Sequence, residues 1–123
     1  MAVVLVVDGD VLVRHAIADY LRHCGYSVIE AASQAEAMTV LGDASLHIET
    51  VLCDVGLDGF GLRKSLRDLR PDVDVILAGS VAAVAHAAAD LCETGPHLAR
   101  PYDPQGVVDQ IKQMRARRDR HPA

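Results

Sequence analysis

Two aspartates stand where apolar stretches of the sequence end. Asp54 follows the apolar residues 51–53, and Asp8 follows the apolar residues 3–7. Such runs are typical of buried strands, and the carboxyl ends of the strands form the ligand-binding edge of an open parallel sheet. If the two strands are neighbours, the carboxylates lie about 5 Å apart, which is the spacing between strands. Two like charges that close need a cation, a proton or a basic side chain, so this pair is the first candidate for a functional site.

The elements that must position these carboxylates alternate along the chain. The hydrophobic pattern predicts strands over residues 3–7, 27–31, 47–53, 73–78 and, very short, 98–99. It predicts helices between them over residues 11–24, 34–41, 59–69 and 81–93, and a last helix from 104. Strict alternation of strands and helices implies an α/β fold, with a parallel sheet covered by helices on both faces.

Capping residues mark where several helices begin or end. Asp10 and Ser33 are suited to N-terminal caps, Ser33 with Glu36 three residues later as a capping box, and Gly25 is suited to the end of the first helix. The pair Asp103-Pro104 opens the last helix as cap and first position. On the third helix the expected inward residues are Leu62, Leu66 and Leu69, and on the last helix Val107 or Val108, Ile111 and Met114.

The totals exclude several classes of protein. The 123 residues suit one domain, half of them are hydrophobic, and the net charge of −5 argues against a nucleic-acid-binding protein. No apolar run approaches the ~20 residues that cross a membrane, and no signal segment precedes residue 3, so we expect a cytoplasmic protein. Cys24, Cys53 and Cys92 are expected to be reduced core residues. The basic residues of the last stretch, which include Arg115, are expected to form a solvated helix end.

Several motifs, taken in their order and spacing, resemble the response-regulator receiver domain, the chemotaxis-type module of two-component signalling. They are Val6-Val7-Asp8 with Asp10 and Val13-Arg14, Gly25-Tyr26-Ser27-Val28, Val51-Leu52-Cys53-Asp54, Asp58-Gly59 with Leu62, Leu66 and Arg67, residues 71–77, and Arg100-Pro101-Tyr102. The resemblance covers residues 3–114 and implies one doubly wound, flavodoxin-like sheet of five parallel strands in the order 2-1-3-4-5. That order places the first and third strands side by side, as the carboxylate pair requires.

The resemblance also implies a chemistry. In the family, the aspartate that ends the third strand accepts a phosphoryl group from a histidine kinase or a phosphotransfer protein, and Asp54 matches it. A magnesium ion neutralises the anions that this transfer brings together. By the family pattern, Asp8, Asp54 and the carbonyl of Gly56 are the metal ligands, and Arg100 holds the phosphoryl oxygens. Ser80, next to the fourth-strand hydroxyl position of the family, is the candidate for a second phosphate contact.

The metal side of the site departs from the family pattern. The second acidic residue of the family falls on Gly9, and the loop after Asp54 is about three residues short. Asp10 could replace the missing carboxylate by a small backbone shift, although it is also suited to cap the helix. We therefore expect magnesium binding to be weak or lost.

The phosphate side departs as well. The fourth-strand hydroxyl position falls on Gly79, with Ser80 next to it either as a phosphate contact or as an ordinary helix cap. The fifth-strand lysine position falls on Arg100, and the switch-aromatic position on His97. Because Arg100 is the only basic side chain that the resemblance places there, we expect it to bridge the carboxylates when no metal is bound.

We interpret the chain as a single-domain response regulator, with a receiver-like domain over residues 1–118 and a basic tail over 119–123. The leading hypothesis is phosphorylation on Asp54 with signalling through protein contacts, not enzymatic turnover. The alternative is a pseudo-receiver, a binding module that works without phosphate. A small aspartate-nucleophile phosphatase is disfavoured, because the chain lacks the additional cap segment or the second catalytic acid that such an enzyme needs. The alanine-rich fourth helix and the fifth helix could present a face to a downstream protein or to a second copy in a homodimer.

Overall fold

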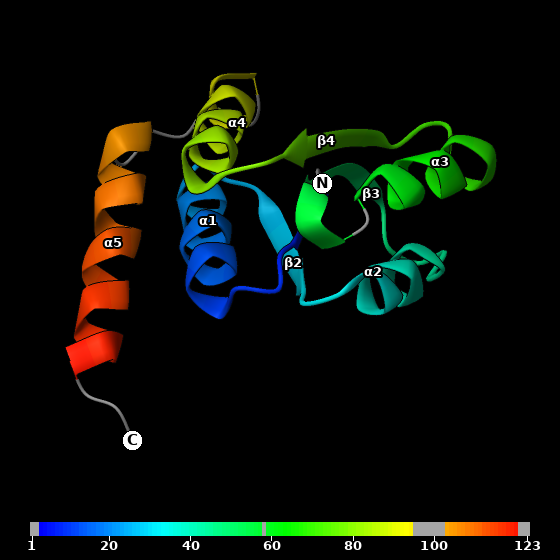
Figure 1. Ribbon diagram of the computed structural model, residues 1–123. Coiled ribbons are helices and arrows are strands. Elements are labelled where there is room, and N and C mark those ends of the chain that lie inside the picture. Colours follow the sequence, from blue (N-terminus) through cyan, green and yellow to red (C-terminus); the bar gives the residue numbers. More distant parts are fainter. Residues whose placement is uncertain (1–2, 58, 95–102, 121–123) are drawn as a thin grey trace.

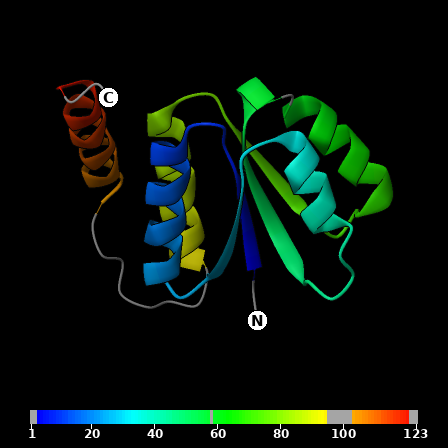
Figure 2. The same cartoon turned by 90° about the horizontal axis from the view of Figure 1, so that it is seen from below.

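The computed structural model describes residues 3–57, 59–94 and 103–120. Helices cover both faces of a central parallel sheet (Figure 1). The elements in chain order are β1 (Val3–Val7), α1 (Val11–His23), β2 (Ser27–Ala31), α2 (Gln34–Leu41), β3 (Ile48–Asp54), the 3-10 turn η1 (Val55–Leu57), α3 (Gly59–Leu69), β4 (Asp74–Ala78), α4 (Val81–Thr94) and α5 (Pro104–Arg120). Figure 2 shows α1, α4 and α5 on one side of the sheet and α2 and α3 on the other.

The sheet has the predicted parallel order as far as the structure describes it. Its four strands lie in the order β2-β1-β3-β4, and every neighbouring pair is parallel. The predicted first and third strands are therefore neighbours, and their register pairs Val7 with Cys53. The predicted fifth strand, residues 98–99, lies outside the described residues. Five strands were predicted, and the sheet formed by the described residues has four.

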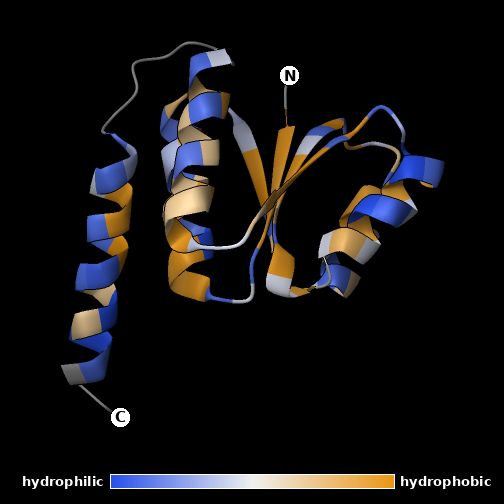
Figure 3. Ribbon diagram, turned by 45° about the horizontal axis from the view of Figure 1, so that its top comes forward, coloured by the Kyte–Doolittle hydropathy of each residue, from blue (hydrophilic) through white to orange (hydrophobic). Residues whose placement is uncertain are grey.

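The core has two parts, one on each face of the sheet. Leu52 packs with α1, α4 and α5, whereas Val51 and Cys53 pack with α2 and α3. This alternation follows from the period of two along a strand. Figure 3 shows the hydrophobic strands enclosed by helices whose outer faces are more polar. The side chains of Cys53 and Asp54 therefore point to opposite faces of the sheet, because they are adjacent in β3.

Local signals fix the helix ends where the sequence placed them. The Asp10 carboxylate caps α1 and the Ser33 hydroxyl caps α2 by accepting the Glu36 N–H. Gly25 follows α1 with a φ of 101°, a conformation that favours glycine. The Asp103 carboxylate accepts the Gly106 N–H at the start of α5, 2.8 Å away. These caps satisfy backbone donors that a helix cannot pair within itself.

One expectation about the buried faces of the helices needs correction. Leu62 and Leu66 are buried as predicted, but Leu69 is 66% exposed. It is the last residue of α3 and borders a surface groove with Met38 and Leu41 instead of entering the core. On α4 the buried residues are Val84, Ala85, Ala88, Ala89 and Cys92. Small alanine side chains let α4 pack closely against α1 and α5.

The expectation that all three cysteines are reduced is wrong for two of them. Cys24, which follows α1, and Cys92, in the last turns of α4, form a disulfide. The two helices lie on the same face of the sheet and bring the Cα atoms to 5.5 Å, within the range that a disulfide spans. Spacing in the sequence could not reveal this, because 68 residues separate the pair. Cys53 is a buried free thiol, and burial with the Asp54 and Asp8 charges raises its pKa to about 11.

Among the described residues, no helix is both long and apolar enough to span a membrane.

Candidate functional site

Asp8, Asp10 and Asp54 line one pocket at the carboxyl ends of β1 and β3. The pocket has a volume of about 230 Å³, and Gly79, Ser80 and Arg115 also line it. We call this cavity the acidic pocket. Asp8 immediately follows β1 and Asp54 ends β3, so the pairing of Val7 with Cys53 places the two carboxylates at the same edge of the sheet. The predicted juxtaposition of Asp8 and Asp54 is therefore present.

Asp8 is the most buried of these carboxylates, with 8% of the residue exposed. Its Oδ1 accepts the Asp10 N–H at 2.8 Å, and its backbone N–H donates to Ala31 O on β2. Burial raises the pKa of the Asp8 carboxyl, and the Asp54 and Asp10 charges raise it further, outweighing the hydrogen bond from Asp10. Keeping Asp8 ionised in the folded protein therefore already costs free energy. A further negative charge placed beside it would increase that cost.

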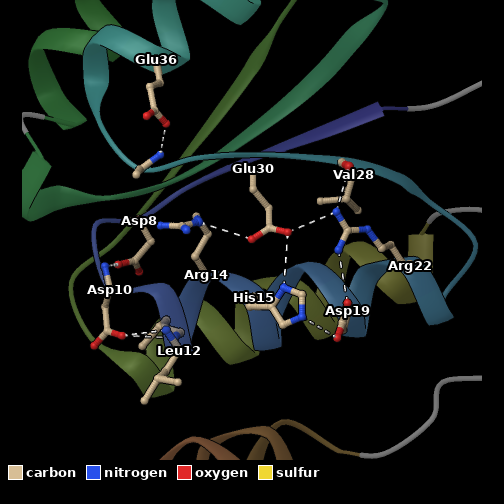
Figure 4. Close-up of polar contacts among 12 residues, drawn as sticks. Asp8, Asp10, Leu12, Arg14, His15, Asp19, Arg22, Val28, Glu30 and Glu36 are labelled. Carbon is tan, nitrogen blue, oxygen red and sulfur yellow. Dashed lines mark hydrogen bonds and ion pairs between the residues drawn. The ribbon is translucent and has the colours of Figure 1, made fainter. Parts of the chain in front are cut away.

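Arg14 holds the backbone at this end of β1. Its Nη1 donates to Asp8 O at 2.9 Å, and its Nε donates to Glu30 on β2 at 3.3 Å. Glu30 also pairs with Arg22, 3.2 Å away (Figure 4). This network ties α1 to the ends of β1 and β2, so it positions the main chain from which the Asp8 side chain extends.

We expect Asp8→Asn to stabilise the protein at neutral pH and to change its stability little at about pH 3. Since the folded-state pKa of Asp8 lies above its ordinary value of 3.8, the folded protein holds this proton more tightly than the unfolded chain. The cost of ionising Asp8 therefore appears as the pH rises above 3.8 and is complete above the folded-state pKa. Asparagine keeps an oxygen for the Asp10 N–H but carries no charge. Urea unfolding at both pH values measures the difference, and an equal gain at both would contradict a charge effect.

Asp54 is partly buried, and its carboxylate is turned toward the short loop that follows. Its Oδ1 accepts the Gly56 N–H at 3.1 Å within the η1 turn. A Cβ added at Gly56 would lie 3.6 Å from both Asp54 carboxylate oxygens, so this loop folds closely over the acid. The contact between the two residues thus runs through the Gly56 N–H. Gly56 as a metal ligand through its carbonyl stays a prediction.

Asp10 has two structural roles that use both of its carboxylate oxygens. Oδ1 accepts the N–H groups of Leu12 and Val13 at 2.9 and 3.4 Å, and Oδ2 pairs with Arg115 Nη2 at 2.6 Å. Burial raises the pKa of Asp10, but the hydrogen bond from Arg115 and those from the helix backbone outweigh it, and the pKa is lowered. Asp10 could replace the carboxylate missing at Gly9 only by giving up these partners.

The described residues of the acidic pocket offer few ligands to a divalent metal ion. Within residues 3–57, 59–94 and 103–120, no three histidine, cysteine, aspartate or glutamate side chains are grouped so as to hold one. Gly9 provides no side chain, although space exists there, because an added Cβ would meet Leu57 Cδ2 only at 3.6 Å and Ala32 O at 3.7 Å. Hard cations of the magnesium type require several oxygen ligands in near-octahedral geometry.

Of the predicted phosphate-side residues, Gly79 and Ser80 are in the pocket wall. The Ser80 hydroxyl accepts the Ala83 N–H at 3.0 Å, so Ser80 acts as the cap of α4. A phosphate contact of Ser80 stays a prediction. Arg100 and His97 lie outside the described residues.

Sequence reasoning missed Arg115. We expected it in a solvated helix end, and that expectation is wrong, because the side chain is 37% exposed and pairs with Asp10 at the pocket. A signal for it was present: Arg115 is four residues after the buried Ile111 and directly after the partly buried Met114. A residue at that spacing lies at the edge of the buried stripe of the helix, where a long side chain can reach a neighbouring element.

Comparisons with known proteins agree with one another. Residues 4–112 match the model of the response regulator receiver domain. The transcriptional regulatory protein AruR of Pseudomonas aeruginosa is 31% identical over 96% of this chain and 50% of its own length. The sensor kinase CckA of Brucella abortus is 31% identical over 96% of this chain and 13% of its own length. The chain thus spans about half the length of AruR and a smaller part of CckA.

Solved structures share the fold. The MaeR response regulator, solved with beryllium trifluoride bound, has a TM-score of 0.56 and 28% identity, covering 95% of this chain and 99% of its own. A response regulator receiver domain protein from Clostridium thermocellum has a TM-score of 0.60 and 21% identity, covering 97% and 98%.

Proposed function

This chain belongs to the response regulator receiver domain family, and from that membership we propose that Asp54 accepts a phosphoryl group from a histidine kinase or a phosphotransfer protein. The observation that carries the proposal is the position of Asp54. It ends the buried strand β3, opens into the acidic pocket and lies at the same sheet edge as Asp8. A carboxylate held by a rigid strand at an accessible edge is suited to act as a nucleophile.

The proposed reaction moves one phosphoryl group between two side chains. An oxygen of the Asp54 carboxylate attacks the phosphorus of a phosphohistidine, a P–O bond forms, and the P–N bond breaks. The departing imidazole nitrogen keeps the electron pair and takes up a proton. The product, an acyl phosphate, adds negative charge beside Asp8, so the pocket must supply positive charge or hydrogen-bond donors.

We propose that the wall of the pocket at the start of α4 receives the phosphoryl oxygens. Ser80 lies there with its hydroxyl beside the first turn of α4, and backbone N–H groups at a helix N-terminus favour anions. Arg100, which lies outside the described residues, is proposed as a second phosphate-binding residue on the family pattern. Phosphorylation would be read by a downstream protein, or by a second copy of the chain, at the face of α4 and α5.

A pseudo-receiver, which binds partners without phosphate, is the second candidate. It is favoured by the commitment of both Asp10 oxygens to the α1 cap and to Arg115. It is also favoured by the lack of a three-ligand metal cluster within the described residues. The two candidates differ in whether Asp54 can be modified.

We expect a small phosphodonor, such as acetyl phosphate, to add one phosphoryl group to the wild-type protein and none to Asp54→Asn. Intact-mass spectrometry measures the adduct, with and without magnesium. Asp68→Asn removes an exposed acid of α3 and is the matched control, which should still be modified. Beryllofluoride should perturb the spectrum of the wild type but not that of Asp54→Asn. If the wild type takes up no phosphoryl group at forcing donor concentrations, the pseudo-receiver is correct.

A further inference from the structure

We propose that Arg115 is the resident cation of the acidic pocket and that a divalent metal ion competes with its guanidinium for the charge of the pocket. Binding of the metal would weaken the hold of Arg115 on Asp10 and loosen the last turns of α5. This inference concerns metal exclusion and helix anchoring, and it does not depend on Asp54 being phosphorylated.

Arg115 and Asp10 form a short, partly shielded ion pair at the pocket. Arg115 Nη2 lies 2.6 Å from Asp10 Oδ2, and both side chains are partly shielded, with 37% and 29% exposed. Among the described residues that line the pocket, Arg115 is the basic one; it pairs with Asp10, and Asp8 and Asp54 line the same pocket. A charge-assisted hydrogen bond of this length, partly removed from water, is stronger than a typical surface ion pair.

A metal ion in the pocket would compete with Arg115 for the same negative charge. Among the described residues, the lining of the pocket contains one basic side chain, Arg115, beside the carboxylates of Asp8, Asp10 and Asp54. A guanidinium is weakly hydrated and remains charged, whereas magnesium gives up its water reluctantly and requires several oxygen ligands. A metal ion that approaches Asp8 and Asp54 would meet the field of Arg115, and it would find Asp10 already paired. Removing the guanidinium removes that repulsion and frees one oxygen of Asp10.

Two kinds of contact hold α5 in place. Val107 and Ile111 are fully buried, and Met114 is packed against the same core. After Arg115, residues 116–119 are exposed. The first three turns of α5 are therefore held by apolar burial, whereas the last turns are held at Arg115. Loss of the contact with Asp10 should loosen the end of the helix and leave its first turns docked.

The two effects are linked. If a metal ion and the Arg115–Asp10 contact exclude each other, each must weaken the other by the same factor. Coupling between two such events usually amounts to about 5- to 150-fold in affinity. The sign of the coupling is the direct test of the proposal, because a merely structural arginine would not raise metal affinity when removed.

The first experiment is a calorimetric titration with magnesium chloride alone. We expect Arg115→Ala to bind magnesium about tenfold or more tightly than the wild type. Arg115→Lys, which keeps the charge, should stay near the wild type. Arg118→Ala is the matched control, because it removes the same charge from an exposed position one turn later. If Arg115→Ala binds magnesium no more tightly than Arg118→Ala, the proposal is wrong.

The second experiment uses hydrogen exchange without metal and tests the anchoring separately. In Arg115→Ala, amides of residues 112–119 should exchange faster than in the wild type, and those of 107–111 should be unchanged. Arg118→Ala should match the wild type throughout. Faster exchange over the whole of α5 would mean that Arg115 supports the entire helix, and no change would mean that it anchors nothing. Either result would overturn the anchoring part of the proposal.

Discussion

Replacing Cys24 by serine is expected to lower the free energy of unfolding by about 2–5 kcal/mol, the usual cost of losing a native disulfide. The bond between Cys24 and Cys92 closes a loop with a sequence separation of 68 residues. For a loop of that length, the chain-entropy argument gives a loss of about 4 kcal/mol, because the unfolded chain gains conformations when the bond is absent. Urea unfolding monitored by circular dichroism measures the change.

Reduction offers an internal control for this prediction. Adding a reductant should destabilise the wild type by about as much as Cys24→Ser does, and it should not destabilise Cys24→Ser further. Cys53→Ala removes the free thiol on the other side of the sheet and should leave the response to reductant intact. A wild-type protein whose unfolding is the same with and without reductant would show that the bond does not form in solution.

Leu52→Ala is expected to lower the free energy of unfolding by about 2–5 kcal/mol, as large-to-small changes in a packed core do. Leu52 is 1% exposed and packs on the side of the sheet that α1, α4 and α5 cover. It lies two residues before Asp54, so both side chains extend from the same face of β3. The cavity left by the missing atoms would therefore open beneath the acidic pocket.

Leu52→Met is the matched control, because it keeps most of the volume and should cost less than about 1.5 kcal/mol. Chemical denaturation of both variants gives the comparison. If Leu52→Ala and Leu52→Met were equally stable, the α1, α4 and α5 side of the core would be packed too loosely to support the position of Asp54.

Much of the fold could be predicted because its signals are local. The apolar runs before Asp8 and Asp54 predict buried strands, and the structure confirms β1 and β3 there. The helix caps at Asp10 and Ser33 and the turn at Gly25 are confirmed for the same reason, since each depends on a few adjacent residues. The juxtaposition of the two carboxylates needed only the strand order in addition.

The parts that could not be predicted depend on contacts between distant segments. The Cys24–Cys92 bond requires the relative placement of α1 and α4, which no spacing encodes. The Arg115–Asp10 pair joins residues 105 positions apart and depends on how α5 lies against α1. The family pattern predicts Arg100 as the source of positive charge. Among the described residues, Arg115 of α5 supplies positive charge at the pocket.

The strand order has a kinetic consequence. β1 is the first strand of the chain but an inner strand of the sheet, with β2 on one side and β3 on the other. Its pairing with β3 joins segments that are separated in the chain by α1, β2 and α2, so two helical crossovers lie between them. Contacts so distant in sequence form slowly, because the intervening loop must be closed before any pairing energy is gained. We therefore expect Asp8 and Asp54 to approach each other late in folding. If the two carboxylates come together only after the transition state of folding, their mutual repulsion speeds unfolding. The rate of folding then stays nearly unchanged.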